Sequence, residues 1–324
     1  MVNVWAAITS TLSVSALLLL RNMTEERASV RVAFLGNSIQ YYNDLPRLMK
    51  ALSNNAIEED SCYRGNATLS SLFQDGNGMS RKFQTTNALR PDGTYDIGAD
   101  TVTSLLQQRQ QQPQDWDFVV MNDHTQHPTR SDTRFESITT LVQDYAPLLR
   151  QSGAIPIFLM TYAYQERGVY GSDDLGDVVQ FTKHLQEGYE SYVQALAEVL
   201  PVTSTPRIAP VGFAFLAIHK ENLQMWSQLF HPDKKHPSPY GSFLIACVLY
   251  YTILGVTQGT EAIMIPDDGA SAIWEKARPR VMQPDGEDPL PIPTYDEAKY
   301  LSSVALRVCL TYNNKNKKKI TVQE

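Results

Sequence analysis

The sequence predicts an α/β protein in which a parallel β-sheet is covered by helices on both faces. Short apolar runs, each typical of a buried strand, alternate with longer amphipathic stretches that are typical of helices. Strands separated by helices pair in parallel, and such sheets are buried on both faces. The chain of 324 residues is 43% hydrophobic and 19% charged, which excludes a disordered or collagen-like protein.

The first strand is expected over Val30–Leu35, a Val-, Ala-, Phe- and Leu-rich run that stops at Gly36. A helix follows over Leu45–Leu52, with Pro46 in its first turn. The other strands are expected over Ala67–Phe73, Asp117–Met121, Ile155–Thr161 and Arg207–Val211. The other helices are expected over Thr101–Gln112, Phe135–Gln151, Asp177–Leu200 and Gly241–Leu254. The Pro-rich chain after Gly255 is expected to be irregular and to wrap the surface.

Charge and cysteine content narrow the function classes. The formal net charge is −7, and four of the lysines lie in the last twelve residues, so the body of the protein is acidic. An acidic body argues against a nucleic acid as the main partner, because phosphate neutralisation needs clustered cations. The three cysteines have no metal-like spacing and form no disulfide framework.

The N-terminal segment has a distinct composition. Residues 2–20 carry no charge and end in four consecutive Leu, close to the ~20 apolar residues of a membrane span. No Lys or Arg precedes them and no clear cleavage site follows, so residues 1–27 are interpreted as a signal peptide or a signal-anchor. Asn22 and Asn66 each begin a glycosylation triplet. These features predict a secreted or membrane-anchored protein of the secretory pathway, tethered in the second case through residues 2–20. The alternative is a cytoplasmic protein with an apolar N-terminal helix.

Residues suited to catalysis follow three of the predicted strands, where ligands bind in sheets of this kind. Ser38, after Gly36 and Asn37, is placed as a nucleophile whose own N–H lies near a helix start. Asn122 follows the third run and can donate its amide to an oxyanion. Asp233 and His236 lie three residues apart in one loop, so the carboxylate can orient the imidazole as a base.

These motifs, in this order, resemble the four blocks of the SGNH (GDSL-like) hydrolase family. Gly36-Asn37-Ser38 matches the first block, with Asn37 where commoner members have Asp. Gly78 is the best match to the glycine of the second block, and Asn122 matches the third. Asp233 to Pro237 matches the Asp-x-x-His-Pro of the last block, and an apolar helix follows. The resemblance covers residues 32–255.

The resemblance implies a serine esterase on a flavodoxin-like, three-layer α/β/α sandwich with about five parallel strands. Ser38 would attack an ester carbonyl, His236 would take its proton and Asp233 would hold His236. The Ser38 and Gly78 N–H groups and the Asn122 amide would bind the oxyanion. No metal or organic cofactor is implied. The hydrolase domain would span residues 28–260, residues 261–312 would wrap that domain, and 313–324 would be a disordered basic tail.

Other functions fit the same residues. An acyltransferase would carry an identical triad, and a non-catalytic carbohydrate-binding relative would keep the fold. A metal site is a further alternative because Asp123, His124, His127, His231 and His236 lie near two strand ends. However, residues 32–35 lack the Asp-x-His that metallophosphoesterases carry on their first strand.

The substrate stays open at this stage. Carbohydrate O-acetyl esters, lipid esters and small acyl esters all fit the motifs. Specificity would be set by loops such as 81–95 and 165–176, and no motif constrains the sequences of these loops. Asn37, His124 and His127 are expected to line the substrate pocket. The oligomeric state is also not indicated.

Overall fold

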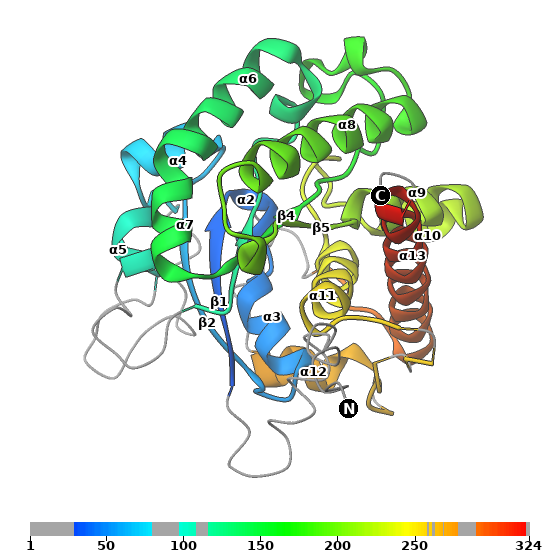
Figure 1. Ribbon diagram of the computed structural model, residues 1–324. Helices are drawn as coiled ribbons and strands as arrows, with labels where there is room; N and C mark the ends of the chain where they lie inside the picture. Colours follow the sequence, from blue (N-terminus) through cyan, green and yellow to red (C-terminus); the bar gives the residue numbers. More distant parts are fainter. Residues whose placement is uncertain are drawn as a thin grey trace, which may run out of the picture.

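A five-stranded parallel sheet forms the centre of the protein, in the order β2-β1-β3-β4-β5 (Figure 1). The strands are β1 (Val30–Gly36), β2 (Ile57–Tyr63), β3 (Phe118–Met121), β4 (Ile155–Leu159) and β5 (Arg207–Ala209). Every neighbouring pair is parallel. This is the flavodoxin-like strand order, with its topological switch between β1 and β3. The predicted fold class is confirmed.

The computed structural model describes residues 29–79, 97–107, 116–257, 259–260, 263–267, 269–277 and 290–321, with side chains through residue 314. Within it, alternate residues of each central strand enter two separate cores. Val32 and Phe34 of β1 belong to one apolar cluster, whereas Ala33 and Leu35 belong to the other. Because successive strand residues point to opposite faces, the two clusters are the two interfaces of a three-layer sandwich.

Helices cover both faces of the sheet (Figure 1). One face packs against α3 (Leu45–Leu52), α9 (Val211–Glu221), α10 (Leu223–Gln228), α11 (Pro239–Leu254), α12 (Ala270–Ala277) and α13 (Tyr295–Thr321). The other packs against α4 (Leu69–Asp75), α5 (Val102–Gln107), α6 (Ser131–Thr140), α7 (Ala146–Ser152) and α8 (Val178–Ala197), with a π-helical turn over Leu141–Tyr145. A single short turn, α2 (Ser38–Tyr41), follows β1 directly.

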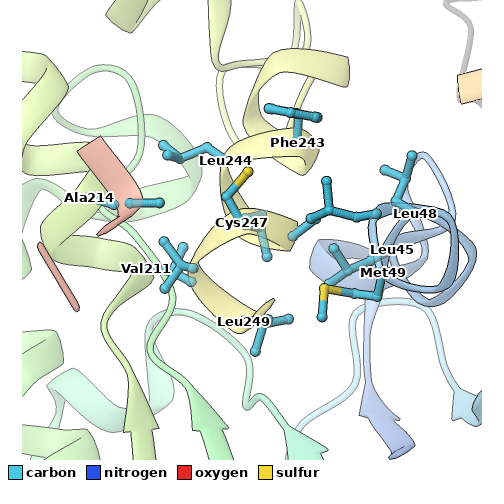
Figure 2. Close-up of a cluster of buried hydrophobic side chains, with 14 of the residues drawn as sticks. Leu45, Leu48, Met49, Val211, Ala214, Phe243, Leu244, Cys247 and Leu249 are labelled. Atoms are coloured by element: carbon cyan, nitrogen blue, oxygen red, sulfur yellow. The ribbon is translucent and has the colours of Figure 1, made fainter. Parts of the chain in front are cut away.

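Helix α11 is apolar on all sides because other elements surround it. Figure 2 shows Phe243, Leu244, Cys247 and Leu249 of α11 between the side chains of α3 and those of α9. Helix α13 packs along it too, through residues such as Leu301. A helix without a polar face is stable only where it is buried in this way. This packing fixes the start of α11, and therefore the loop that precedes it.

Three expectations from the sequence differ from the structure. Ala67–Phe73 is not a strand: Thr68 forms a capping box with Ser71 and starts helix α4. The second strand is instead β2, at the edge of the sheet. The chain after Gly255 is also not wholly irregular, since α12 and α13 pack on the core, and α13 continues into the residues expected to form a basic tail.

The N-terminal segment and Asn22, for which a signal peptide or anchor and a glycosylation site are predicted, lie outside the described residues. Asn66 is described: it lies exposed in the turn after β2, with φ 57°. In the part of the chain that the structure describes, no helix has the length and apolarity needed to cross a bilayer. Cys62, Cys247 and Cys309 are buried free thiols.

Helix α8 lies very close to the turn after β3, and this contact limits the side chain at position 188. A Cβ atom added at Gly188 in α8 would overlap the carbonyl oxygen of Pro128, which lies in the 3₁₀ turn His127–Thr129. Gly188→Ala is therefore expected to lower the free energy of unfolding by about 1–3 kcal/mol, as overpacking does, although Gly to Ala normally stabilises a helix. Urea unfolding of this variant against Gln194→Ala, an exposed site on the same helix, measures the effect. A stabilised Gly188→Ala protein would contradict the prediction.

Candidate active site

The predicted catalytic residues meet at the carboxyl edge of the sheet, at its topological switch. Ser38 follows β1 and Asn122 follows β3, which are adjacent strands. Asp233 and His236 lie in the loop between α10 and α11. Carboxyl ends of parallel strands at such a switch are where ligands bind in doubly wound folds.

Ser38 is positioned by a short capped helix. The side chain of Asn37 accepts a hydrogen bond from the Ile39 N–H at 3.1 Å, and so acts as the N-cap of α2. Ser38 is the first residue of that helix. The preceding Gly36 has no room for a side chain, because a Cβ atom there would overlap Oδ1 of Asn122. The glycine of the Gly-Asn-Ser sequence therefore allows the end of β1 to lie directly against Asn122.

Ser38, His236 and Asp233 form a continuous hydrogen-bonded chain. Nε2 of His236 lies 2.8 Å from Oγ of Ser38, and Nδ1 of His236 lies 2.6 Å from Oδ2 of Asp233. The second oxygen of Asp233 accepts the N–H groups of Lys235 at 3.0 Å and His236 at 2.9 Å. The carboxylate therefore orders the backbone of its own loop as well as the imidazole. This is the geometry of a nucleophile, a base and an orienting acid.

The ionisation of this chain suits base catalysis. Burial alone would raise the pKa of Asp233, but hydrogen bonds from His231 and His236 outweigh it and hold that pKa far below its usual value. Burial lowers the pKa of His236 below 6.5, against the opposing effect of Asp233, and the charges of Lys235 and His231 lower it further. His236 is thus neutral at neutral pH while Asp233 stays ionised.

Two residues that the sequence reasoning missed hold this chain together. The ring of Tyr42 stacks on the imidazole of His236, with centroids 4.0 Å apart and planes 10° apart. Asn43 donates through Nδ2 to the carbonyl of Pro237 at 3.1 Å and to Oγ of Ser242 at 2.9 Å. Both residues lie in the turn after α2, so they tie the serine turn to the histidine loop. No sequence motif marks them, because their partners lie some 200 positions away in the chain.

Asn122 is held in one orientation by its neighbours. Its Oδ1 accepts from Nε2 of Gln40 at 2.7 Å, and its Nδ2 donates to Oδ1 of Asn37 at 2.9 Å and to the carbonyl of Asp123 at 3.0 Å. This network fixes which amide atom is the donor. To bind an oxyanion at Ser38, Nδ2 of Asn122 would have to give up its hydrogen bond to the Asp123 carbonyl.

The structure does not support Gly78 as an oxyanion donor. Its N–H donates to the carbonyl of Tyr63 at 2.8 Å, and Gly78 itself is exposed beside Arg64. Gly65, two residues after the end of β2, lies beside the helix turn that carries the nucleophile. A Cβ atom there would come within 3.1 Å of the Tyr41 hydroxyl, and that hydroxyl hydrogen-bonds Ser38. The N–H of Gly65 makes only a long 3.4 Å contact with the Gly78 carbonyl.

Asp123, considered above as a metal ligand, is a structural residue. Its fully buried carboxylate accepts from the N–H groups of Leu69 and His124 and from the hydroxyls of Ser137 and Tyr192. Burial raises its pKa, and these hydrogen bonds and the nearby His127 oppose that effect. Within the described residues, no three His, Cys, Asp or Glu side chains are grouped as a metal site requires.

His124 and His127 lie together in the loop after β3. Their ring centroids are 5.5 Å apart in an edge-to-face arrangement. Burial lowers the pKa of His124 to about 4, and the charges of Lys235, His127 and Arg130 add to this effect. His124 is therefore a neutral side chain near the triad loop.

Comparisons with known proteins support the fold. The sequence matches no family model and no curated protein. Among solved structures, the chain is similar to a DUF4886 family protein from Bacteroides uniformis, with 14% identity, a TM-score of 0.52, and coverage of 86% of this chain and 94% of that one. It is also similar to a protein from Slackia heliotrinireducens described as "a putative SGNH hydrolase", with 26% identity, a TM-score of 0.46, and coverage of 69% and 99%.

The likeness to the DUF4886 family protein concerns the fold alone. The fold is a three-layer α/β/α sandwich of the flavodoxin-like order, shared with the DUF4886 family protein. The chain is similar to SGNH hydrolases in its first, third and last motif blocks, whose residues the fold brings together at one edge of the sheet.

Proposed function

We propose that the protein is a hydrolase of the SGNH type that cleaves an ester through an acyl-enzyme on Ser38. The observation that carries this proposal is the hydrogen-bonded chain from Ser38 through His236 to Asp233. It joins a hydroxyl, a neutral imidazole and a carboxylate in the order that serine catalysis needs.

In the first half-reaction, Oγ of Ser38 attacks the ester carbonyl while Nε2 of His236 takes the hydroxyl proton. The imidazolium that forms is stabilised by Asp233, which accepts a hydrogen bond from its Nδ1–H and is itself held by two backbone N–H groups. His236 then gives its proton to the leaving alkoxide. In the second half-reaction, His236 takes a proton from the water that attacks the acyl-enzyme. It then returns this proton to Oγ of Ser38 as the carboxylic acid leaves.

The developing oxyanion needs donors beside Ser38. The N–H of Ser38, at the start of α2, is the first of these. The second is the amide of Asn122, which Asn37 and Gln40 hold in place. Gly65 takes the place that the motif comparison gave to Gly78, because its N–H makes only the long contact described above.

The proposal is tested by covalent labelling of the full chain with a fluorophosphonate, followed by peptide mass spectrometry. The label is expected on Ser38 alone, because only a serine with an adjacent base is activated. His236→Ala is expected to abolish labelling while leaving the fold, measured by circular dichroism, intact. A label on another serine, or none on the folded wild-type protein, would reject the serine mechanism.

The pH dependence of the reaction follows from the state of His236. Burial holds its pKa below 6.5, and the catalytic form is the neutral imidazole, so activity is lost only as the pH falls through that lowered pKa. The profile of kcat/KM for 4-nitrophenyl acetate is expected to be flat at neutral pH with an acid limb centred below 6.5. An acid limb centred above neutrality would contradict this assignment of the base.

A matched variant checks the cause of that shift. The charge of Lys235 lowers the pKa of His236, so Lys235→Met is expected to move the acid limb to higher pH. Lys234→Met removes a neighbouring charge that is already paired with Glu166 at 2.8 Å, and is expected to leave the limb in place.

A further inference from the structure

Three loops converge beside the triad and are joined by specific contacts. Nε2 of Gln126, in the loop after β3, donates to the carbonyl of Tyr170 at 2.9 Å. The N–H of Gln165, after β4, donates to the carbonyl of Lys234 at 3.0 Å. Nζ of Lys235 lies 4.7 Å from the centroid of the Tyr170 ring. Lys235 is therefore enclosed between its own triad loop and the loop after β4.

Lys235 differs sharply from its neighbour Lys234. The side chain of Lys234 is 45% exposed and pairs with Glu166, as a surface lysine does. Lys235 is only 8% exposed, and no carboxylate of the described residues lies within ion-pair distance of its ammonium. Asp233 attracts it from a distance, but both oxygens of that carboxylate already accept other hydrogen bonds. A mostly buried lysine without a paired anion costs free energy, so its presence beside the triad favours a functional role.

Two polar atoms in the loop after β3 lack partners, and the charge of Lys235 acts on the first of the two rings, that of His124. Nδ1 of His124 and Nδ1 of His127 are both buried and have no hydrogen-bond partner in the described structure. Buried polar atoms are usually satisfied, so such atoms beside a catalytic site point to a ligand. The charges of Lys235 and Arg130 both act on His124, and Arg130 is already paired with Asp174 at 2.8 Å. Lys235 has no such ion pair among the described residues and can therefore pair with an incoming anion.

We propose that Lys235, with His124 and His127, forms a subsite for a carboxylate carried by the ester substrate. This inference rests on the proposed function and narrows its substrate class from esters in general to esters that bear a negative charge near the scissile bond. Lys235 supplies the charge and the two imidazoles supply polar contacts. Tyr170 covers the ammonium, and the residue is 57% exposed, so its ring also forms a face against which the substrate can lie.

The test compares two esters that differ only in charge, 3-acetoxybenzoate and 3-acetoxybenzamide, on the full chain at the plateau of the pH profile. The wild-type kcat/KM is expected to favour the anion by about 10-fold or more, the range of a hydrogen bond to a charged group. Lys235→Met is expected to reduce this preference to within about 2-fold of unity, whereas Lys235→Arg and Lys234→Met retain it. A preference unchanged in Lys235→Met, or absent in the active wild type, would overturn the subsite.

A binding measurement separates this inference from the proposed function. Calorimetry with the products 3-hydroxybenzoate and 3-hydroxybenzamide requires no catalysis. Tighter binding of the benzoate to the wild type and to Ser38→Ala, lost in Lys235→Met, supports the subsite even if neither ester is hydrolysed. Equal binding of the two products to wild type and Lys235→Met would overturn it even if both esters are good substrates.

Discussion

Ser38→Ala is expected to lower kcat/KM for 4-nitrophenyl acetate by about 10³-fold or more. The substitution removes the one oxygen that lies 2.8 Å from Nε2 of His236 and leaves that base without a proton to take. It also removes the hydrogen bond of that oxygen with the Tyr41 hydroxyl, but the N–H of residue 38 and the Asn37 cap are unaffected. The loss should therefore appear in kcat, and the melting temperature should stay near that of the wild type. Steady-state kinetics and thermal unfolding of the two proteins measure both.

A matched control is the buried Ser204, whose hydroxyl donates to the carbonyl of Gly153 at 3.0 Å, away from the triad loop. Ser204→Ala is expected to cost some stability and to keep kcat within about 2-fold, since surface and core changes remote from a site rarely alter chemistry. If Ser38→Ala retained the wild-type rate, the acyl-enzyme mechanism would be wrong.

The sequence predicted the central sheet well because its inner strands are apolar throughout. β1, β3 and β4 are buried on both faces, and runs such as Phe118–Met121 show this directly. β2 escaped prediction because it lies at the edge of the sheet, where Glu58, Glu59 and Asp60 remain partly exposed. The composition of β2 is typical of a loop, and β2 is a strand because it pairs with β1.

That error explains the wrong glycine. Placing the second strand at Ala67–Phe73 moved its expected carboxyl end to the turn at Gly78, whereas the true end of β2 is Tyr63. Gly65 then becomes the glycine beside the nucleophile turn. The residues of the first and last blocks could be chosen as candidates because each lies within a few residues of a well-marked strand or helix, and their catalytic roles stay a prediction. Their mutual distances depend on the whole fold.

Contacts across the fold are the part that no local pattern can supply. The stacking of Tyr42 on His236 joins two residues that lie far apart along the chain. The pair Lys234 and Lys235 is typical of a solvated turn. In the structure, Lys234 is exposed and paired with Glu166, whereas Lys235 is buried. A positive φ of 64° at Lys234 turns the chain there, and this backbone geometry is not visible in the sequence.

Asp233→Asn is the second substitution with a large expected effect, a loss of about 10³–10⁴-fold in kcat. The asparagine oxygen can still accept the N–H groups of Lys235 and His236, so the loop should keep its shape. Its NH₂ group would then face Nδ1 of His236 and donate to it. The imidazole would be held in the tautomer that carries its proton on Nε2, and that nitrogen could no longer take the proton of Ser38.

Two measurements distinguish this wrong tautomer from unfolding. Nitrogen NMR shifts of His236 should show the proton moved from Nδ1 to Nε2, and fluorophosphonate labelling of Ser38 should slow in parallel with kcat. Glu166→Gln removes an exposed carboxylate that pairs only with Lys234, and is expected to keep kcat within about 2-fold. A fully active Asp233→Asn protein would mean that the imidazole is oriented without the carboxylate. Tyr42 would then be the residue to replace next, because its ring stacks directly on the imidazole of His236.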